Sequence, residues 1–263
     1  MVTTAIIADG SVRVTVLRPT SVVDGTGDAR EAFERVWARL PPFEEANSFC
    51  VLAHDGGLFL KGQRIQPRVR VESLLQSNRL LHETRYLGHM HDLGVPVPEI
   101  LAHGVERCGG VPVRTFLLLR HVADSEDLRA LVSRTTVGER RDVWEPVGNA
   151  VARLHAVGLF HRDLTARNVL VRPRGGEAAV HLIDCPRAEW GRLPLRRKFL
   201  RRSDLFRLGR SILAAGGTEG EVRTMLCAYG ARDVEEVLTQ LACARRERPT
   251  ARMRAKVWVT LGV

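Results

Sequence analysis

The chain has 263 residues, enough for one large domain or two small lobes around a buried core, and its 44 % apolar and 27 % charged residues are typical of globular proteins. No apolar run approaches the roughly 18 residues of a membrane span, the N-terminus lacks the basic start of a secretion signal, and five scattered cysteines without a CxxC pair argue against a disulfide framework or a zinc site. The net charge is +10, and residues 161–210 alone hold 13 basic and 5 acidic residues, which favours an anionic partner.

Strand and helix patterns alternate at the beginning of the chain. Regularly spaced valines predict strands within residues 1–23. Residues 28–40 carry an apolar stripe at helical spacing, and the two prolines after it predict the end of that helix. Residues 48–61 predict a β-hairpin, because an Asp-Gly pair stands between two apolar runs.

A long helix and a buried strand are predicted next. Residues 72–92 have helical spacing of apolar side chains, and Gly94 and Pro96 predict where that helix ends. Residues 111–120 are an apolar run that predicts a buried strand. The polar residues 121–127 predict a hinge between this strand and the second half of the chain.

The remainder of the sequence is mainly helical. Residues 139–157 predict a helix, and residues 201–213 predict another that Asp204 opens as its N-cap. We therefore predict an α+β protein with two lobes and an active cleft between them. The predicted lobes are a β-rich N-terminal lobe with one long helix over residues 1–120 and a reduced, mainly helical C-terminal lobe over residues 121–263.

The segment 161–168 reads HRDLTARN and matches the catalytic-loop pattern H-R-D-L-x-x-x-N of kinases at every fixed position. Phosphoryl transfer requires an acceptor hydroxyl held in line and neutralisation of the phosphate charge. Asp163 would accept the hydrogen bond of that hydroxyl. The amide oxygen of Asn168 suits Mg²⁺, which prefers hard oxygen ligands. We therefore predict a catalytic Asp163 and a metal-binding Asn168.

Two further charged residues extend this site. Asp184 ends an apolar strand sixteen residues after Asn168 and is the second predicted magnesium ligand, in a triplet that reads Asp-Cys-Pro rather than D-F-G. Lys61 ends the strand LFLK and is predicted to contact the ATP phosphates. Its carboxylate partner is predicted to be Glu83, with Glu72 as the alternative. No G-x-G-x-x-G precedes Lys61, and the corresponding place reads PPFEEAN.

These segments resemble the protein-kinase-like superfamily and, within it, the bacterial lipopolysaccharide kinases of the Kdo/WaaP family. The stretches that carry the resemblance lie between about residues 48 and 213 and include HETRYLGHMHDLGVPVPEIL, VARLHAVGLFHRDLTARNVLV, HLIDCPRA and RRSDLFRLGRSIL. The resemblance implies transfer of the γ-phosphate of ATP to a sugar hydroxyl of a lipopolysaccharide core at the cytoplasmic face of the inner membrane. It also implies that Lys61 and Glu83 hold the phosphates, that Asp163 orients the acceptor, and that Asn168 and Asp184 bind magnesium. In kinases an aspartate at the place of Asp204 holds the catalytic loop from below, so the resemblance implies this role for Asp204 as well.

The interval between Asp184 and Asp204 bears on the substrate class. Only 19 residues separate them and no A-P-E occurs, which is short for an activation segment with a peptide-docking platform and favours a small or glycolipid acceptor. The interval holds a basic stretch that would bind an acidic sugar or anionic membrane headgroups, or would form a solvated basic face. Its basic residues are Arg192, Arg196, Arg197, Lys198, Arg201 and Arg202.

Two alternative functions stay open. One is a compact bacterial serine/threonine or tyrosine protein kinase, and the other is a pseudokinase that acts as a binding module. The intact set of Lys61, Asp163, Asn168 and Asp184 counts against the pseudokinase. Nucleic-acid binding is not expected, because few aromatic residues interleave with the arginines.

Overall fold

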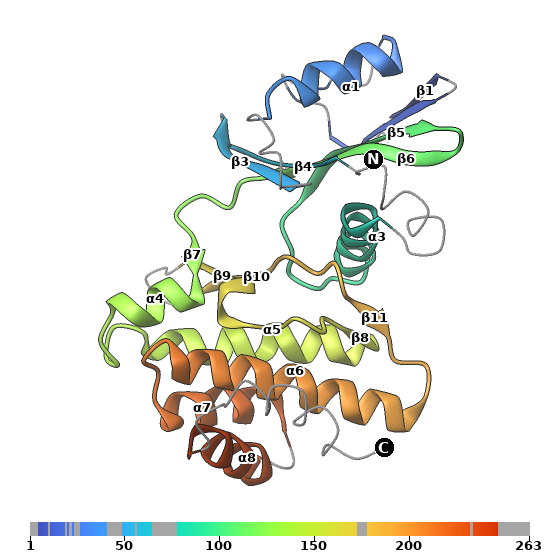
Figure 1. Cartoon of the computed structure of the whole chain (residues 1–263). Coiled ribbons are helices and arrows are strands. Elements are labelled where there is room, and N and C mark those ends of the chain that lie inside the picture. Colours follow the sequence, from blue (N-terminus) through green and yellow to red (C-terminus); the bar gives the residue numbers. More distant parts are fainter. Residues whose placement is uncertain are drawn as a thin grey trace.

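The computed structural model has two lobes, with a β-rich N-terminal lobe above a mainly helical C-terminal lobe in Figure 1. This confirms the predicted α+β, two-lobe architecture. Within the described residues, no helix is long and apolar enough to cross a membrane. The structure describes residues 5–9, 11–18, 20, 23, 27–40, 49–55, 57–64, 78–172, 178–231 and 234–246.

The N-terminal lobe is built on an antiparallel sheet of six strands in the order β1-β2-β5-β6-β4-β3. The strands are β1 (Ala5–Asp9), β2 (Val12–Val16), β3 (Phe49–Asp55), β4 (Leu58–Arg64), β5 (Ile100–Cys108) and β6 (Val111–Arg120). The predicted hairpin and the predicted strand over 111–120 are both present. The central strand β5 was not predicted, since Gly104 interrupts its apolar pattern. The Phe116 ring on the neighbouring strand fills the space above Gly104, where an added Cβ would lie 2.2 Å from a ring carbon.

Helix α1 (Ala29–Trp37) covers one face of this sheet. It begins after Asp28, whose carboxylate accepts a hydrogen bond from the backbone N–H of Arg30 and so caps the helix. The buried side chains of Phe33 and Val36 pack against the sheet in one apolar cluster. The helix predicted over 28–40 is therefore confirmed.

Helix α3 (Arg79–Asp92) lies on the opposite face of the sheet and faces the C-terminal lobe (Figure 1). It begins after Asn78, whose side chain accepts hydrogen bonds from the N–H groups of Leu80 and Leu81. The prediction started this helix at residue 72, but residues 72–77 lie outside the described residues. The buried inner face of α3 includes Glu83, a charged residue that needs a partner there.

The alternation of side chains along β4 directs Lys61 toward α3. Leu60 belongs to the apolar cluster under α1, so the next side chain must point to the other face of the sheet. In agreement with this, Lys61 is paired across the ladder with Leu117, which is buried in the cluster that includes α3. Strand geometry therefore places the Lys61 ammonium on the side of the sheet where Glu83 lies.

The C-terminal lobe consists of helices with short strands at its upper surface (Figure 1). The helices are α4 (Leu128–Arg134), α5 (Trp144–Ala156), α6 (Pro194–Ala214), α7 (Glu219–Tyr229) and α8 (Val234–Arg246), with the 3-10 turns η2 (Arg141–Val143) and η3 (Ala166–Asn168). The short strands are β7 (Glu126–Asp127), β8 (Leu159–Phe160), β9 (Val169–Arg172), β10 (Ala179–Leu182) and β11 (Glu189–Trp190), paired as β10-β9-β7 and β11-β8.

The start of α6 corrects one prediction. The helix begins at Pro194, a residue whose fixed φ suits the first helical position, and not at Asp204. Asp204 is wholly buried within the helix, so the prediction that it opens and caps the helix is wrong. Its carboxylate is directed at the catalytic loop, which is the role that the kinase resemblance implied for it.

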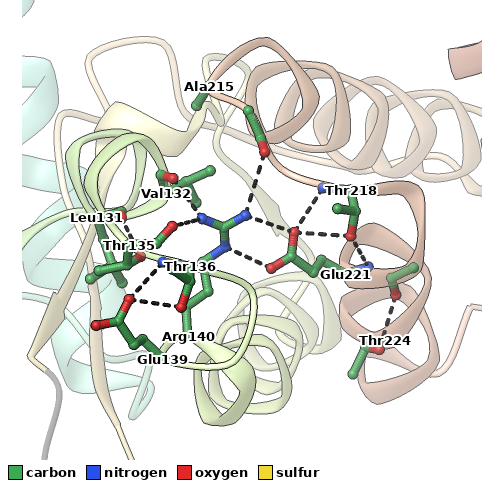
Figure 2. A network of polar contacts seen from close by, with 12 residues as sticks. Leu131, Val132, Thr135, Thr136, Glu139, Arg140, Ala215, Thr218, Glu221 and Thr224 are labelled. Carbon is green, nitrogen blue, oxygen red and sulfur yellow. Dashed lines mark hydrogen bonds and ion pairs between the residues drawn. The ribbon is translucent and has the colours of Figure 1, made fainter.

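A buried ion pair fixes α7 to the connection between α4 and α5 (Figure 2). Arg140 donates hydrogen bonds to both carboxylate oxygens of Glu221, at 2.6 and 3.2 Å, and to the carbonyls of Val132 and Thr135. Glu221 also accepts a hydrogen bond from the N–H of Thr218, which closes a capping box at the start of α7. Because both charged groups are hydrogen-bonded, the pair can stay buried inside the C-terminal lobe.

Replacing Glu221 with glutamine should lower the free energy of unfolding by about 2 kcal/mol, because the Arg140 guanidinium would lose its buried counter-charge while keeping its carbonyl partners. Burial opposes ionisation of Glu221, but the hydrogen bonds from Arg140 and Thr218 outweigh it and lower its pKa. A lowered pKa stabilises the fold above the ordinary value of 4.5, and this contribution is lost as the pH falls through the folded-state pKa.

Urea unfolding of the wild type and of the Glu221→Gln variant at neutral and acidic pH would measure this loss of stability. The difference in the free energy of unfolding between the two proteins should shrink in acid. Glu219→Gln is the matched control, since Glu219 lies in the same first turn of α7 but is exposed. Equal stability of the two variants at neutral pH would contradict a net contribution from the buried pair.

Candidate active site

Three predicted site residues meet between the lobes. The ammonium of Lys61 donates hydrogen bonds to Glu83 Oε1 at 2.6 Å and to Asp184 Oδ1 at 2.5 Å. Lys61 comes from β4, Glu83 from α3, and Asp184 from the residues after β10, so the cluster joins both lobes. Lys61 and Glu83 are buried, whereas Asp184 is partly exposed. Glu72, the alternative partner of Lys61, and the segment PPFEEAN lie outside the described residues.

Burial and charge act against each other in the Lys61–Glu83–Asp184 cluster. Burial would lower the pKa of Lys61, but the two carboxylates raise it, so the ammonium keeps its charge. Burial would raise the pKa of Asp184, but the charge and hydrogen bond of Lys61 lower it. For Glu83 burial prevails over Lys61 and raises the pKa. With both carboxylates ionised, the cluster carries one more negative than positive charge.

The backbone at Asp184 is held in an uncommon conformation. Its φ is +59°, in the left-handed region that side chains other than glycine rarely adopt. The preceding residues are fixed by backbone hydrogen bonds from Leu182 N to the Pro96 carbonyl and from Ile183 N to the Asn168 carbonyl. The second of these bonds brings the Asn168 backbone beside the residue that precedes Asp184. Such local strain is common at functional sites, where surrounding contacts hold it.

Asp204 holds the catalytic loop from below. Its carboxylate accepts hydrogen bonds from the backbone N–H groups of His161 at 2.8 Å and Arg162 at 2.9 Å. Arg162 has a φ of +62°, so this second bond stabilises another left-handed residue. The imidazole Nε2 of His161 lies 2.8 Å from the Ile183 carbonyl oxygen and donates to it, which joins the loop to the strand before Asp184.

A buried histidine behind the catalytic loop was not among the predicted site residues. His155 Nε2 lies 3.3 Å from Asp204 Oδ2, and its Nδ1 lies 3.0 Å from the Tyr229 hydroxyl. Burial raises the pKa of Tyr229 to about 12, so its hydroxyl keeps its proton and can donate to Nδ1. This assignment makes Nε2 a donor to Asp204. His155 falls at an ordinary helix position, and only the packing of α5, α6 and α7 gives it this role.

Asp163 and Asn168 face each other across the turn of the catalytic loop. The Asn168 amide nitrogen donates to the Asp163 carbonyl oxygen at 2.8 Å, which fixes the amide orientation and leaves its oxygen available as an acceptor. The Asp163 carboxylate is flanked by two arginines, with Arg167 Nη2 at 3.8 Å and Arg207 Nη1 at 4.0 Å. Arg207 lies on α6 one helical turn after Asp204 and was not among the predicted site residues.

The donor set fits a nucleotide with a hard divalent cation. The Asp184 carboxylate and the Asn168 amide oxygen are the kinds of ligand that Mg²⁺ prefers. Lys61 is anchored by Glu83 and lies where it could contact phosphate oxygens. The roles predicted for these residues are chemically consistent with their contacts.

The basic stretch 192–202 is largely occupied by contacts within the chain. Arg196 bonds to Glu189, Arg197 to the Gly191 carbonyl, and Arg202 to Glu236. Arg201 hydrogen-bonds Tyr229. Within the described part of the chain, Arg192 and Lys198 make no ion pair. The stretch therefore does not form one open basic surface, and fewer of its residues are available to a ligand than the sequence suggests.

The chain is similar in sequence to several curated kinases. It is 29 % identical over 161 residues to a 3-deoxy-D-manno-octulosonic acid kinase of Actinobacillus succinogenes, covering 59 % of this chain and 65 % of that protein. It is 28 % identical over 131 residues to the KEOPS complex subunit Bud32 of Pyrococcus abyssi, covering 49 % of this chain and 54 % of that protein. The chain thus spans less than two thirds of the length of these relatives.

A solved structure and a family model agree with the geometry. The structure described as WaaP in complex with acyl carrier protein aligns with a TM-score of 0.53 at 23 % identity, over 80 % of this chain and 86 % of that chain, which shows the shared protein-kinase-like fold. The model of the lipopolysaccharide kinase (Kdo/WaaP) family matches residues 60–229, a range that includes Lys61, Asp163 and Asp184. The chain therefore belongs to the lipopolysaccharide kinase (Kdo/WaaP) family.

Proposed function

We propose that this chain is a phosphotransferase that moves the γ-phosphate of ATP to a hydroxyl of an acidic sugar in a lipopolysaccharide core, with Mg²⁺ as its metal. The observation that carries the proposal is the ammonium of Lys61 hydrogen-bonded to both Glu83 and Asp184, beside a catalytic loop held by Asp204. This arrangement supports an active kinase over a pseudokinase. Membership of the lipopolysaccharide kinase family supports a sugar acceptor.

The proposed reaction assigns each residue a limited task. The acceptor hydroxyl oxygen attacks the γ-phosphorus, the bond to the β-phosphate oxygen breaks, and ADP leaves with that oxygen. Asp163 accepts the hydrogen bond of the hydroxyl and receives its proton. Lys61 holds the phosphates, with Glu83 anchoring it. When bound between Asn168 and Asp184, Mg²⁺ would neutralise charge on the phosphates.

An acidic acceptor is supported by the arginines beside Asp163. Arg207 is half-buried with its guanidinium 4.0 Å from the Asp163 carboxylate. Burial, together with the charges of Arg210 and Arg187, lowers the pKa of Arg207 in spite of Asp163 and Asp204, which raise it. Several positive charges thus gather beside the catalytic aspartate, and a carboxylate or phosphate on the acceptor would be attracted to them.

The test is transfer of labelled γ-phosphate from ATP with magnesium to a Kdo-bearing lipid A precursor and to a protein mixture, with Asp163→Ala as the blank. Label in the glycolipid that is absent from the blank is the expected result. Label only in protein would replace the proposal with the protein-kinase alternative. If neither acceptor is labelled, nucleotide binding would distinguish a different acceptor from a pseudokinase.

Replacing Arg207 with glutamine should raise the KM for the acidic acceptor about tenfold, because the acceptor would lose one charge-assisted hydrogen bond. The change in kcat should be smaller. The KM for ATP should not change. Arg129→Gln is the matched control, because Arg129 is exposed on α4. If both variants kept the wild-type KM for the acceptor, Arg207 would not contact it, and another group would supply the anion site.

A further inference from the structure

The start of α6 protrudes from the C-terminal lobe. All eight residues from Arg192 to Phe199 are exposed, and the first buried side chain of this 21-residue helix is Leu200. Figure 1 shows this end of α6 at the edge of the lobe, opposite α4. The first turns of the helix therefore pack little against the rest of the protein.

Large apolar side chains are concentrated in this protruding segment. The exposed fraction is 37 % for Trp190, 68 % for Leu193, 83 % for Leu195 and 36 % for Phe199. Over the described residues, only Ile6, Leu93 and Val137 are also large, apolar and exposed, so four of the seven such residues lie within ten positions. Leu195 and Phe199 are four residues apart, which puts them on one face of the helix. A concentration of this kind marks an interaction surface.

Cations alternate with these apolar side chains. Residues 190–202 hold six basic residues and no acidic one. Lys198 and Arg192 make no ion pair within the described part of the chain, and the Arg196 guanidinium lies 5.7 Å from the centre of the Phe199 ring. Apolar and tryptophan side chains enter the boundary between headgroups and acyl chains, while lysine and arginine attract anionic headgroups. This combination fits a lipid surface of negative charge.

We propose that the 190–199 patch, defined as Trp190, Arg192, Leu193, Leu195, Lys198 and Phe199, docks the protein on an anionic lipid bilayer. The patch is tied to the catalytic loop. Strand β11, which contains Trp190, pairs with β8 immediately before His161, and Glu189 of β11 accepts a hydrogen bond from Arg162 at 2.6 Å. If the proposed function holds, docking would present the catalytic loop to a sugar carried on a lipid; docking itself does not require that function.

The test is flotation of the whole chain with vesicles of phosphatidylcholine alone or mixed with phosphatidylglycerol, without nucleotide or acceptor. We expect binding to the mixed vesicles only, weakened by added salt. Leu195→Ser should lower the partition coefficient about tenfold. Lys198→Gln should lower it about fivefold, as expected for one cation near an anionic surface.

Matched controls separate the patch from general surface effects. Val137→Ser removes an exposed apolar residue in the connection between α4 and α5, and Arg129→Gln removes an exposed cation on α4; both should bind as the wild type does. Asp163→Asn should also bind normally, so failure of catalysis and failure of docking are distinguishable.

Three outcomes would overturn the proposal. They are absence of binding to the mixed vesicles, equal binding to neutral vesicles, and equal losses in the patch and control variants. Self-association that Leu195→Ser abolishes, without any vesicle binding, would identify the patch as a contact between copies of the chain.

Discussion

Replacing Asp163 with asparagine should lower kcat about a thousandfold, because the acceptor hydroxyl would lose the carboxylate that orients it and takes its proton. Asparagine has the same shape but cannot accept that proton at neutral pH. The Asp163 side chain is only partly exposed and contacts Arg167 and Arg207 at ion-pair distance, so the variant should fold normally. Steady-state transfer to a saturating glycolipid acceptor measures the effect.

Two further measurements make the Asp163 result specific. Nucleotide binding and the thermal midpoint should match those of the wild type, because Lys61, Glu83 and Asp184 are unchanged. Asp142→Asn, at an exposed position before α5, should leave kcat as it is. Turnover near the wild-type rate in the Asp163 variant would mean that another residue orients the acceptor.

Replacing Asp204 with asparagine should destabilise the protein by about 3 kcal/mol, because a wholly buried carboxylate with several donors would be replaced by a group that itself donates. One oxygen could still serve His161 N or Arg162 N, but the amide nitrogen would then face a donor. For a chain of this size the thermal midpoint should fall by roughly 6 to 12 °C.

Activity measured well below the new midpoint should also fall, because Arg162 would lose the bond that holds its left-handed backbone and Asp163 would be less well positioned. The expected split is a lower kcat with an unchanged KM for ATP. Asp142→Asn serves again as the exposed control. A variant with wild-type stability but lost activity would indicate a direct chemical role for Asp204, which its burial argues against.

The sequence by itself indicated the two-lobe fold and supplied the residues that we propose for the site. The strand before Lys61, the helix that carries Glu83 and the loop 161–168 have local patterns, and such patterns record the period of secondary structure and the order of chemical groups along one segment. For the same reason the two-lobe architecture and the family could be inferred before any contact was known. Strand β5 was not predicted, because its glycine at position 104 is explained only by a contact with another strand. The Phe116 ring of the neighbouring strand occupies the space that a side chain at position 104 would need.

Only the tertiary structure decided how the distant parts support one another. The kinase resemblance implied that Asp204 supports the catalytic loop, but the local pattern placed it at the start of a helix. Only the structure shows that its carboxylate, 43 residues from His161, accepts the N–H of His161 from within α6. The contacts of His155, the position of Arg207 beside Asp163, and the exposure of Leu195 likewise depend on how α5, α6 and α7 pack. Local propensity carries no information on these relations, because the free energy of a buried polar contact depends on the partners that packing brings to it.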